Sequence, residues 1–334
     1  MAACRGSAGT AEYDSRMGVI VITGATGFVG TNLVAHLLRV RPTVEILCLG
    51  RNARKLDALA DADHRVVAAR ADVLNPTFAE TVAVALGDRP VDCIVHLASQ
   101  LTSPNDDIDR AVETLRVNGL GTVAVWRLVE RLLKAGGVSS VVHASSILVY
   151  GHPGRDPVSE DAVLAPRDVY GASKAASEHI ARYFATKFRV PLSVIRPGFI
   201  YGPSDSSGKV IYRFVEAAIR GDDLVIRADA GTFRDYVHVD DVGRVIEAAI
   251  AAPPDRLNVI NASGGEAVTL ARLAATVCAA TGSSSRIVVD QSTEAQGDPL
   301  YGCVVADTVR LRAMLDNPIT LDDGIRQLAG DSRV

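Results

Sequence analysis

The chain has 334 residues, 48% of them hydrophobic, a composition that supports a sizeable folded core and excludes a largely disordered protein. Its 35 Lys and Arg residues against 39 Asp and Glu residues give a net charge of −4, which argues against general binding to nucleic acid or anionic lipid. The five cysteines show no metal-ligand spacing, and no apolar run reaches the roughly 18 residues of a membrane span. We therefore expect a cytoplasmic protein without a metal site, disulfide framework or transmembrane helix.

Short apolar strands and helical segments alternate from Gly18 onward. Strands separated by helices of this length indicate βαβ units and a parallel sheet. We predict an α/β fold in which residues 17–200 form a Rossmann domain with a doubly wound parallel sheet, preceded by a disordered tail at residues 1–16. The predicted strands are 19–23, 44–49, one within 64–71, 91–97, 138–144 and 192–196, and the predicted helices are 31–39, 118–135 and 170–187.

The alternation weakens after about residue 200. Loops rich in glycine, serine, aspartate and proline separate two helical segments, at 212–220 and 242–252. We interpret residues 201–334 as a smaller substrate-binding region, partly interleaved with the first domain. Asp106, Asp107 and Asp109 are interpreted as a solvated loop.

A glycine-rich turn joins the first strand to the first helix. Gly24, Gly27 and Gly30 have G-x-x-G-x-x-G spacing, which permits a tight turn and lets backbone N–H groups approach a pyrophosphate at the helix N-terminus. Thr31 follows Gly30, whereas a Walker loop ends in Gly-Lys-Ser/Thr, so nucleotide hydrolysis is disfavoured. The turn between strand and helix therefore predicts a dinucleotide site formed by Gly24, Thr26, Gly27, Phe28, Val29 and Gly30.

The second strand ends at Arg51, where NAD-preferring sites place an acidic residue that accepts from the ribose 2′-hydroxyl. A guanidinium pairs instead with a 2′-phosphate, so we favour NADP over NAD; the alternative is a solvated basic turn. Asp72 after the third strand is either an acceptor for adenine or a turn-forming residue. Other cofactor contacts are expected along the strand ends, at Val73, Leu97, Ala98, Ser99 and Ala144.

Tyr170 and Lys174 form a Y-x-x-x-K pair on one helical face. A lysine ammonium near a phenol favours the phenolate, so Tyr170 is expected to exchange a proton with a substrate oxygen while hydride moves to or from a nicotinamide. Ser146, after the fifth strand, is expected to hold the same oxygen. We predict Ser146, Tyr170 and Lys174 as the catalytic group, with Tyr170 and Lys174 also contacting the cofactor and Ser146 and Tyr170 the substrate.

Several separate motifs resemble one family, the NAD-dependent epimerase/dehydratase family of extended short-chain dehydrogenases/reductases, and in particular the UDP-galactose 4-epimerases. The match covers about residues 18–324. Its motifs are TGATGFVG (23–30), VHLAS (95–99), VNGLGT (117–122), SSILVYG (145–151), YGASK (170–174), RPGFIYGP (196–203) and RDYVHVDD (234–241).

The resemblance assigns further roles. It makes Ser146 the catalytic hydroxyl, with Ser145 as runner-up, and sets Asn118 to support the active-site strand and to contact the cofactor. It places Pro197 near the nicotinamide and Gly198 near the substrate. It also sets Arg234 on the pyrophosphate of a nucleotide sugar, with a surface salt bridge to Asp235 or Asp240 as the alternative. It also implies a homodimer. In the region where dehydratases of the family carry Thr-Asp-Glu, this chain has Ser145, Ser146 and Ile147, so we do not expect efficient elimination of water.

Three functions are compatible with these residues. The first is an NAD(P)-dependent sugar-nucleotide epimerase that oxidises a carbinol and returns the hydride to the other face. The second, favoured by Arg51, is an NADPH-dependent ketoreductase of a keto-sugar or other small ketone. The third is a non-catalytic dinucleotide-sensing protein, which would be expected to have lost Tyr170 or Lys174. His96, His143 and His238 are interpreted as core or edge histidines, not metal ligands.

Overall fold

A computed structural model describes residues 18–102, 107–205, 208–226, 232–290 and 303–331; the predicted tail at residues 1–16 lies outside this range. Its centre is a seven-stranded sheet in which every neighbouring pair is parallel, in the order β11-β6-β5-β4-β1-β2-β3. The predicted doubly wound α/β fold is confirmed. The strands are β1 (Val19–Thr23), β2 (Glu45–Gly50), β3 (Val66–Arg70), β4 (Val91–His96), β5 (Val138–Ala144), β6 (Leu192–Pro197) and β11 (Leu257–Ala262).

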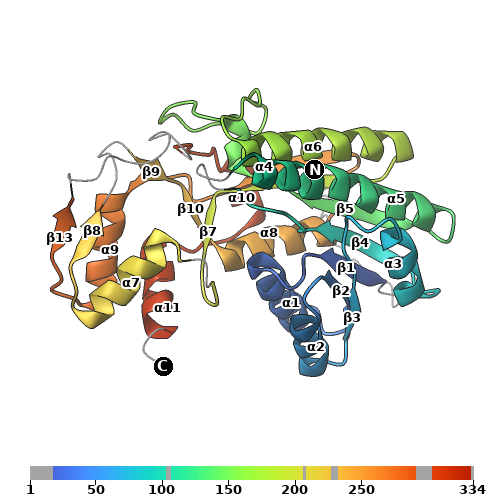
Figure 1. Cartoon of the computed structure of the whole chain (residues 1–334), viewed down its shortest axis with the longest axis horizontal. Helices are drawn as coiled ribbons and strands as arrows, with labels where there is room; N and C mark the ends of the chain where they lie inside the picture. The colour runs from blue at the N-terminus through green and yellow to red at the C-terminus, as the bar shows by residue number, and fades with distance from the viewer. Residues whose placement is uncertain (1–17, 103–106, 206–207, 227–231, 291–302, 332–334) are drawn as a thin grey trace, which may run out of the picture.

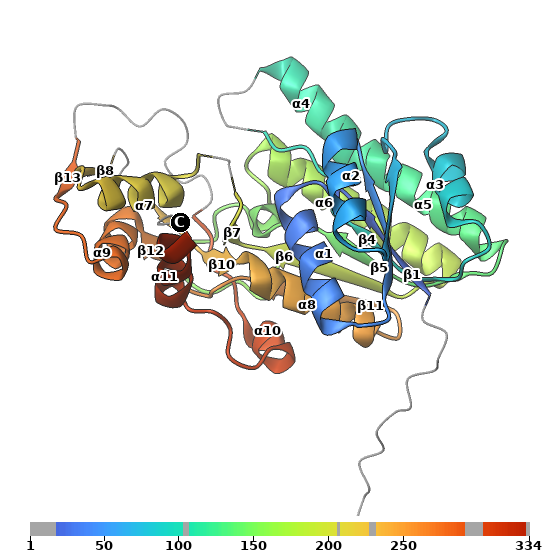
Figure 2. The same ribbon diagram turned by 90° about the horizontal axis from the view of Figure 1, so that it is seen from below.

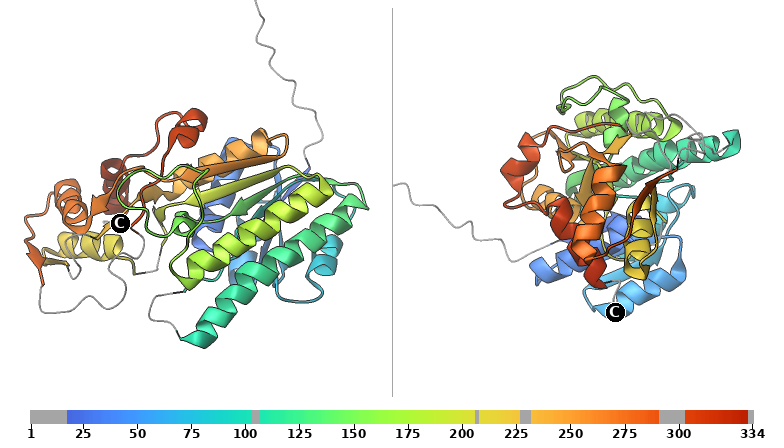
Figure 3. Two further views of the ribbon diagram at one scale, coloured as in Figure 1. Left: turned by 90° about the horizontal axis from the view of Figure 1, so that it is seen from above. Right: turned by 90° about the vertical axis from the view of Figure 1, so that its left-hand side faces the viewer.

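Helices cover both faces of the sheet because its strands are apolar on both sides. In β1, Val19 and Val21 pack into one apolar core and Ile20 and Ile22 into the other. Figure 3 shows α5 and α6 running side by side over one face. That face is covered by α3 (Phe78–Leu86), α5 (Gly121–Leu133) and α6 (Val169–Phe188), and the other by α1 (Phe28–Val40), α2 (Ala53–Ala62), α8 (Val239–Ala251) and α10 (Val309–Met314).

A second lobe lies beside the sheet (Figure 1). Its core is formed by Ile211, Phe214, Leu273, Val277 and Ile325. The parallel pair β7–β10 lies between the two lobes (Figure 2). The chain returns from this lobe to the sheet through α8 and β11. The remaining elements are β7 (Phe199–Tyr201), α7 (Val210–Arg220), β8 (Leu224–Ile226), β9 (Phe233–Arg234), β10 (Tyr236–His238), β12 (Val268–Thr269), α9 (Leu270–Thr281), β13 (Ile287–Val289) and α11 (Leu321–Asp331).

The helix predicted from residue 118 begins ten residues earlier, at Ile108. It comprises α4 (Ile108–Leu115), a π-helical turn (Arg116–Leu120) and α5. The Asp107 carboxylate accepts from the backbone N–H of Arg110 at 2.9 Å and so begins the helix, and Asp109 lies in its first turn. The interpretation of these two residues as a loop was therefore wrong, and Asp106 lies outside the described residues. No helix in the described ranges is long and apolar enough to cross a membrane.

Candidate functional site

The glycine-rich turn forms a close approach between β1, β4 and the start of α1. Gly24 has a φ of 71°, and a Cβ added there would lie 2.7 Å from the Ala98 backbone nitrogen, so only glycine fits. Gly27 caps α1 without any side-chain hydrogen bond, and the first turn contains no acidic residue. The first N–H groups of α1 are consequently available to an anion, a geometry that fits the pyrophosphate of a dinucleotide.

A cavity of about 330 Å³ extends from this turn along the ends of β2 and β3. Arg51 lies at its rim; its guanidinium is exposed and makes no hydrogen bond or ion pair with other described residues. The Asp72 carboxylate accepts from the Leu74 backbone N–H through Oδ1 at 2.9 Å, which forms a turn, and the residue also lines the cavity. The predicted residues that line this cavity are Gly24, Thr26, Gly27, Arg51, Asp72, Val73, Leu97, Ala98 and Ser99.

A second cavity of about 520 Å³ adjoins the same turn and brings Ser146, Tyr170 and Lys174 together. Other predicted residues in its lining are Gly24, Gly27, Phe28, Val29, Gly30, Leu97, Ser99, Ala144, Ser145, Pro197 and Gly198. A further group of mostly apolar lining residues was assigned no role from the sequence, although Leu148, Phe199 and Ile200 lie within two of its motifs. This group is Leu101, Thr102, Leu148, Ile195, Phe199, Ile200, Asp205, Lys209, Val242 and Ile246. Ile147 also lines the cavity; in the sequence it was noted only as a difference from the dehydratases.

The start of α6 fixes the positions of Tyr170 and Lys174. The Asp168 carboxylate accepts from the Gly171 backbone N–H at 2.8 Å, so the helix begins at Val169 and Tyr170 lies in its first turn. Lys174, one turn later, is 4% exposed, and its Nζ donates to the Ala144 carbonyl at 2.8 Å. Nζ also lies 5.9 Å from the centroid of the Tyr170 ring. Burial lowers the pKa of Lys174 to about 8.

The two candidate serines have different partners. The Ser145 hydroxyl donates to Glu178 Oε2 at 3.0 Å, so its hydrogen is directed into the protein. The Ser146 oxygen accepts from the Leu148 backbone N–H at 3.2 Å and caps the short helix Ile147–Tyr150. Because this bond uses only the oxygen of Ser146, the hydroxyl hydrogen is available to a substrate oxygen.

Asn118 lies outside both cavity linings, in the π-helical turn, and ties β4 to α6. Its Oδ1 accepts from the Ser99 hydroxyl at 3.0 Å and the Gln100 backbone N–H at 2.8 Å. Its Nδ2 donates to the Gln100 carbonyl at 3.0 Å and to Ser173 Oγ at 2.8 Å. This side chain therefore fixes the distance between the strand end at Ser99 and the helix that carries Tyr170.

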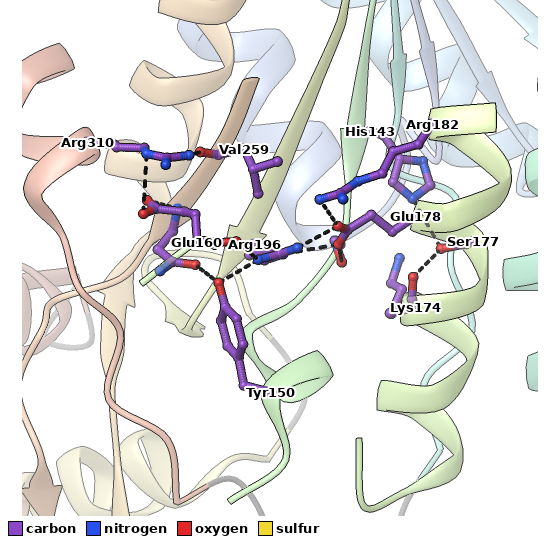
Figure 4. A network of polar contacts seen from close by, with 12 residues as sticks. His143, Tyr150, Glu160, Lys174, Ser177, Glu178, Arg182, Arg196, Val259 and Arg310 are labelled. Carbon is purple, nitrogen blue, oxygen red and sulfur yellow. Dashed lines mark hydrogen bonds and ion pairs between the residues drawn. The ribbon is translucent and has the colours of Figure 1, made fainter. Parts of the chain in front are cut away.

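A buried polar network joins α6 to β6 and β11 (Figure 4). Arg196 and Glu178 are 1% and 0% exposed and form an ion pair through Nε–Oε2 at 3.0 Å and Nη2–Oε1 at 2.5 Å. Arg196 Nη1 also donates to the Tyr150 hydroxyl at 2.6 Å, which in turn donates to Asn261 Oδ1 at 2.7 Å. Glu178 also accepts from Ser145, which directly follows β5. The network therefore holds the end of β5, just before Ser146, against α6, the helix that carries Tyr170.

Arg234 lies beside the second cavity, behind Phe199. Its guanidinium carbon is 5.0 Å from the centroid of the Phe199 ring, and Nη1 donates to the Phe233 carbonyl at 2.8 Å. Asp235, one of the alternative partners, is directed elsewhere: its carboxylate accepts from the backbone N–H groups of Gly265 and Ala306, each at 2.9 Å. Arg234 therefore stacks on a residue that lines the cavity.

His96, His143 and His238 are all buried, and the ring centroids of His96 and His143 lie 5.4 Å apart. Thr122 donates its hydroxyl hydrogen to the Asn118 carbonyl at 2.7 Å, so it accepts from the His96 Nε2 at 3.2 Å and assigns the proton to that nitrogen. Burial lowers the pKa of His96 to about 3 and that of His143 well below its usual value, with the charge of Lys174 acting in the same direction. Within the described ranges no group of three His, Cys, Asp or Glu side chains could hold a metal ion.

The chain is similar to proteins whose names specify reactions of nucleotide sugars. The model of the NAD dependent epimerase/dehydratase family matches residues 20–262. The UDP-glucose 4-epimerase of Mycolicibacterium smegmatis is 35% identical over 229 residues, covering 66% of this chain and 70% of the relative. The dTDP-4-dehydro-6-deoxy-D-allose reductase of Streptomyces bikiniensis is 27% identical over 324 residues, covering 93% and 94%.

Two further comparisons bear on length and fold. A trifunctional UDP-glucose 4,6-dehydratase/UDP-4-keto-6-deoxy-D-glucose 3,5-epimerase/UDP-4-keto-L-rhamnose-reductase of Arabidopsis thaliana is 26% identical over 238 residues, and the match spans only 34% of that relative. The solved structure of MoeE5 in complex with UDP-glucose and NAD superposes with a TM-score of 0.76 at 26% identity, covering 95% of this chain and 99% of that one.

Proposed function

The chain belongs to the NAD dependent epimerase/dehydratase family and is an NAD(P)-dependent enzyme of the extended short-chain dehydrogenase/reductase type, and on that premise we propose that it is a sugar-nucleotide epimerase. The proposal rests on one observation. A single cavity of about 520 Å³ is lined both by the glycine-rich turn and by Ser146, Tyr170 and Lys174. A ligand held at the turn is thereby adjacent to groups that can hold and move a proton.

The chain's own residues account for the proton chemistry. Ser146 Oγ–H donates to the reacting oxygen of the substrate and orients it. Tyr170 Oη takes the proton from that oxygen during oxidation and returns it during reduction. The Lys174 ammonium, 5.9 Å from the Tyr170 ring centroid, stabilises the phenolate that accepts this proton during oxidation and that forms again when the proton is returned during reduction. A bound nicotinamide dinucleotide would supply the acceptor and donor of the hydride.

The dinucleotide would be held by Gly24, Gly27 and the first N–H groups of α1, with adenosine in the cavity beside Asp72. We propose NADP as the preferred cofactor because Arg51, at the rim of that cavity, is exposed and makes no contact with other described residues that would neutralise it. MoeE5, by contrast, was solved with NAD. An NADPH-dependent ketoreductase is the second candidate, favoured by Arg51 and by the similarity to the reductase of Streptomyces bikiniensis along 93% of the chain.

The substrate we propose is a nucleotide sugar. Arg234 supports this, since a planar guanidinium suits phosphate oxygens and its stacking on Phe199 holds it beside the cavity. We also propose a homodimer. Ile108, Val112 and Leu115 recur at helical spacing on α4 and are 77%, 48% and 47% exposed, an apolar stripe that a second copy would cover.

A panel of UDP-, GDP- and dTDP-linked sugars, incubated with and without NADH or NADPH, tests the proposal. Product stereochemistry is read by NMR and cofactor oxidation by absorbance. Inversion of a carbinol without net cofactor consumption is the expected result. Stoichiometric oxidation of NADPH would make the ketoreductase the correct function. If no nucleotide sugar is converted or bound at millimolar concentration, the substrate class is wrong.

A further inference from the structure

Lys209 reaches from the second lobe to the glycine-rich turn. It immediately precedes α7, yet its Nζ lies 5.3 Å from the ring centroid of Phe28, the first residue of α1. Both side chains line the 520 Å³ cavity, together with Gly24 and Gly27. A cation from one lobe is thus held over the start of the helix that forms the anion site in the other.

The ammonium of Lys209 is held by two hydrogen bonds and has capacity for a third. Nζ donates to the Ile200 carbonyl at 3.0 Å and to Asp205 Oδ2 at 2.8 Å. An ammonium has three N–H groups, so one remains for a ligand when the described partners are satisfied. The Lys209 side chain is 40% exposed and that of Asp205 only 5%. The Asp205 side chain is therefore packed against the protein, while the Lys209 side chain is partly exposed and lines the cavity.

The position of Lys209 is important because few cations line the cavity. Its lining contains two cations, Lys174 and Lys209. Lys174 is buried and donates to the Ala144 carbonyl, so its charge acts in the region around Tyr170. The glycine-rich turn itself, residues 24–30, contains no cationic side chain. A diphosphate held there carries negative charge that the backbone N–H dipoles compensate only in part, and the Lys209 ammonium lies 5.3 Å from the ring centroid of Phe28, a residue of the turn.

We propose that Lys209 is a diphosphate-binding residue supplied by the second lobe, and that Asp205 moderates its charge. The inference rests on the proposed function, because the diphosphate belongs either to the dinucleotide or to the nucleotide sugar. Contact with Phe28 favours the dinucleotide.

Two substitutions with opposite expected effects test this. Lys209→Met keeps the apolar stem and removes the charge, so the Kd of NADP+ or NAD+ should rise about tenfold, the size of one charge-assisted hydrogen bond. Asp205→Asn removes the opposing charge, so the same Kd should fall. A gain in affinity cannot arise from misfolding. Lys187→Met is the matched control, since Lys187 also lies over aromatic rings, those of Phe184 and Phe188, but on the far end of α6.

Calorimetric titrations with NADP+, NAD+ and UDP, and with adenosine and uridine as probes without phosphate, separate the sources of the diphosphate. A change confined to the dinucleotides supports binding of the cofactor, and a change confined to UDP supports binding of the substrate. Unchanged affinity of both variants for all diphosphates, with normal binding by the wild type, overturns the inference and leaves the proposed function intact. Failure of the wild type to bind any dinucleotide removes both.

Discussion

Replacing Arg196 by methionine tests whether the buried network holds the catalytic helix in place. The substitution removes both hydrogen bonds to Glu178 and those to the Tyr150 hydroxyl and the Glu160 carbonyl. Loss of one partner of a buried ion pair costs about 3–5 kcal/mol because the other charge stays buried. Glu178 retains Arg182, with Nη2 2.6 Å from Oε1, and the Ser145 hydroxyl. We therefore expect a loss near the lower end, about 3 kcal/mol.

Urea unfolding followed by tryptophan fluorescence measures this loss. Trp126 is the chain's single tryptophan, and its ring stacks on Phe184 of α6 at a centroid distance of 6.2 Å, so it reports on the helix that carries Glu178. The double variant Glu178→Gln/Arg196→Met removes both charges and should be more stable than Arg196→Met alone. Arg220→Met, at an exposed ion pair, is the control and should leave the midpoint unchanged. A loss below about 1 kcal/mol for Arg196→Met, or a double variant less stable than the single, would show that the Arg196–Glu178 ion pair does not hold α6 in place.

Three further predictions concern ligands and pH. Arg51→Asp should weaken NADP+ binding, through loss of a charge-assisted partner and introduction of a like charge, and should weaken NAD+ less or not at all; parallel titrations that show an unchanged preference would make Arg51 a solvated turn residue. Arg234→Ala should weaken nucleotide-sugar binding by about 1.5–3 kcal/mol in calorimetry without altering dinucleotide affinity, and equal losses for both ligands would point to a structural role instead. Because burial lowers the pKa of Lys174 to about 8, its ammonium is present below that pH and lost above it, so kcat/KM should decline above pH 8; a profile flat to about pH 10 would show that the charge is not required.

Local patterns in the sequence predict the sheet and the glycine-rich turn well. Strands such as Val19–Thr23 are apolar on both faces, which is typical of a parallel sheet covered by helices, and the turn after it carries its glycines at spacings that only a close backbone approach explains. Tyr170 and Lys174 are recognisable because one helical turn separates them. The start of α4 was missed because a run of aspartates was interpreted as solvated, although Asp107 is a helix cap.

Contacts between distant segments account for what the sequence did not predict. Tyr150 meets Asn261 across 111 positions, and Arg196 meets Glu178 from a different element, so neither pairing leaves a local pattern. The contact between Lys209 and Phe28 likewise leaves no local pattern, because it depends on how the second lobe lies against the first. Ser145 and Ser146 are adjacent in sequence, and only their hydrogen-bond partners distinguish the hydroxyl directed into the protein from the one available to a ligand.

In the proposed mechanism Tyr170 moves the proton to and from the reacting oxygen. A comparison of wild type with Tyr170→Phe, on a nucleotide sugar that the wild type converts, tests this role. The ring is retained and only the hydroxyl is lost, so dinucleotide affinity should stay unchanged. Turnover should fall by about 10²–10⁴-fold, the contribution of a positioned proton donor and acceptor. A variant that turns over at the wild-type rate while binding the dinucleotide normally would contradict the account.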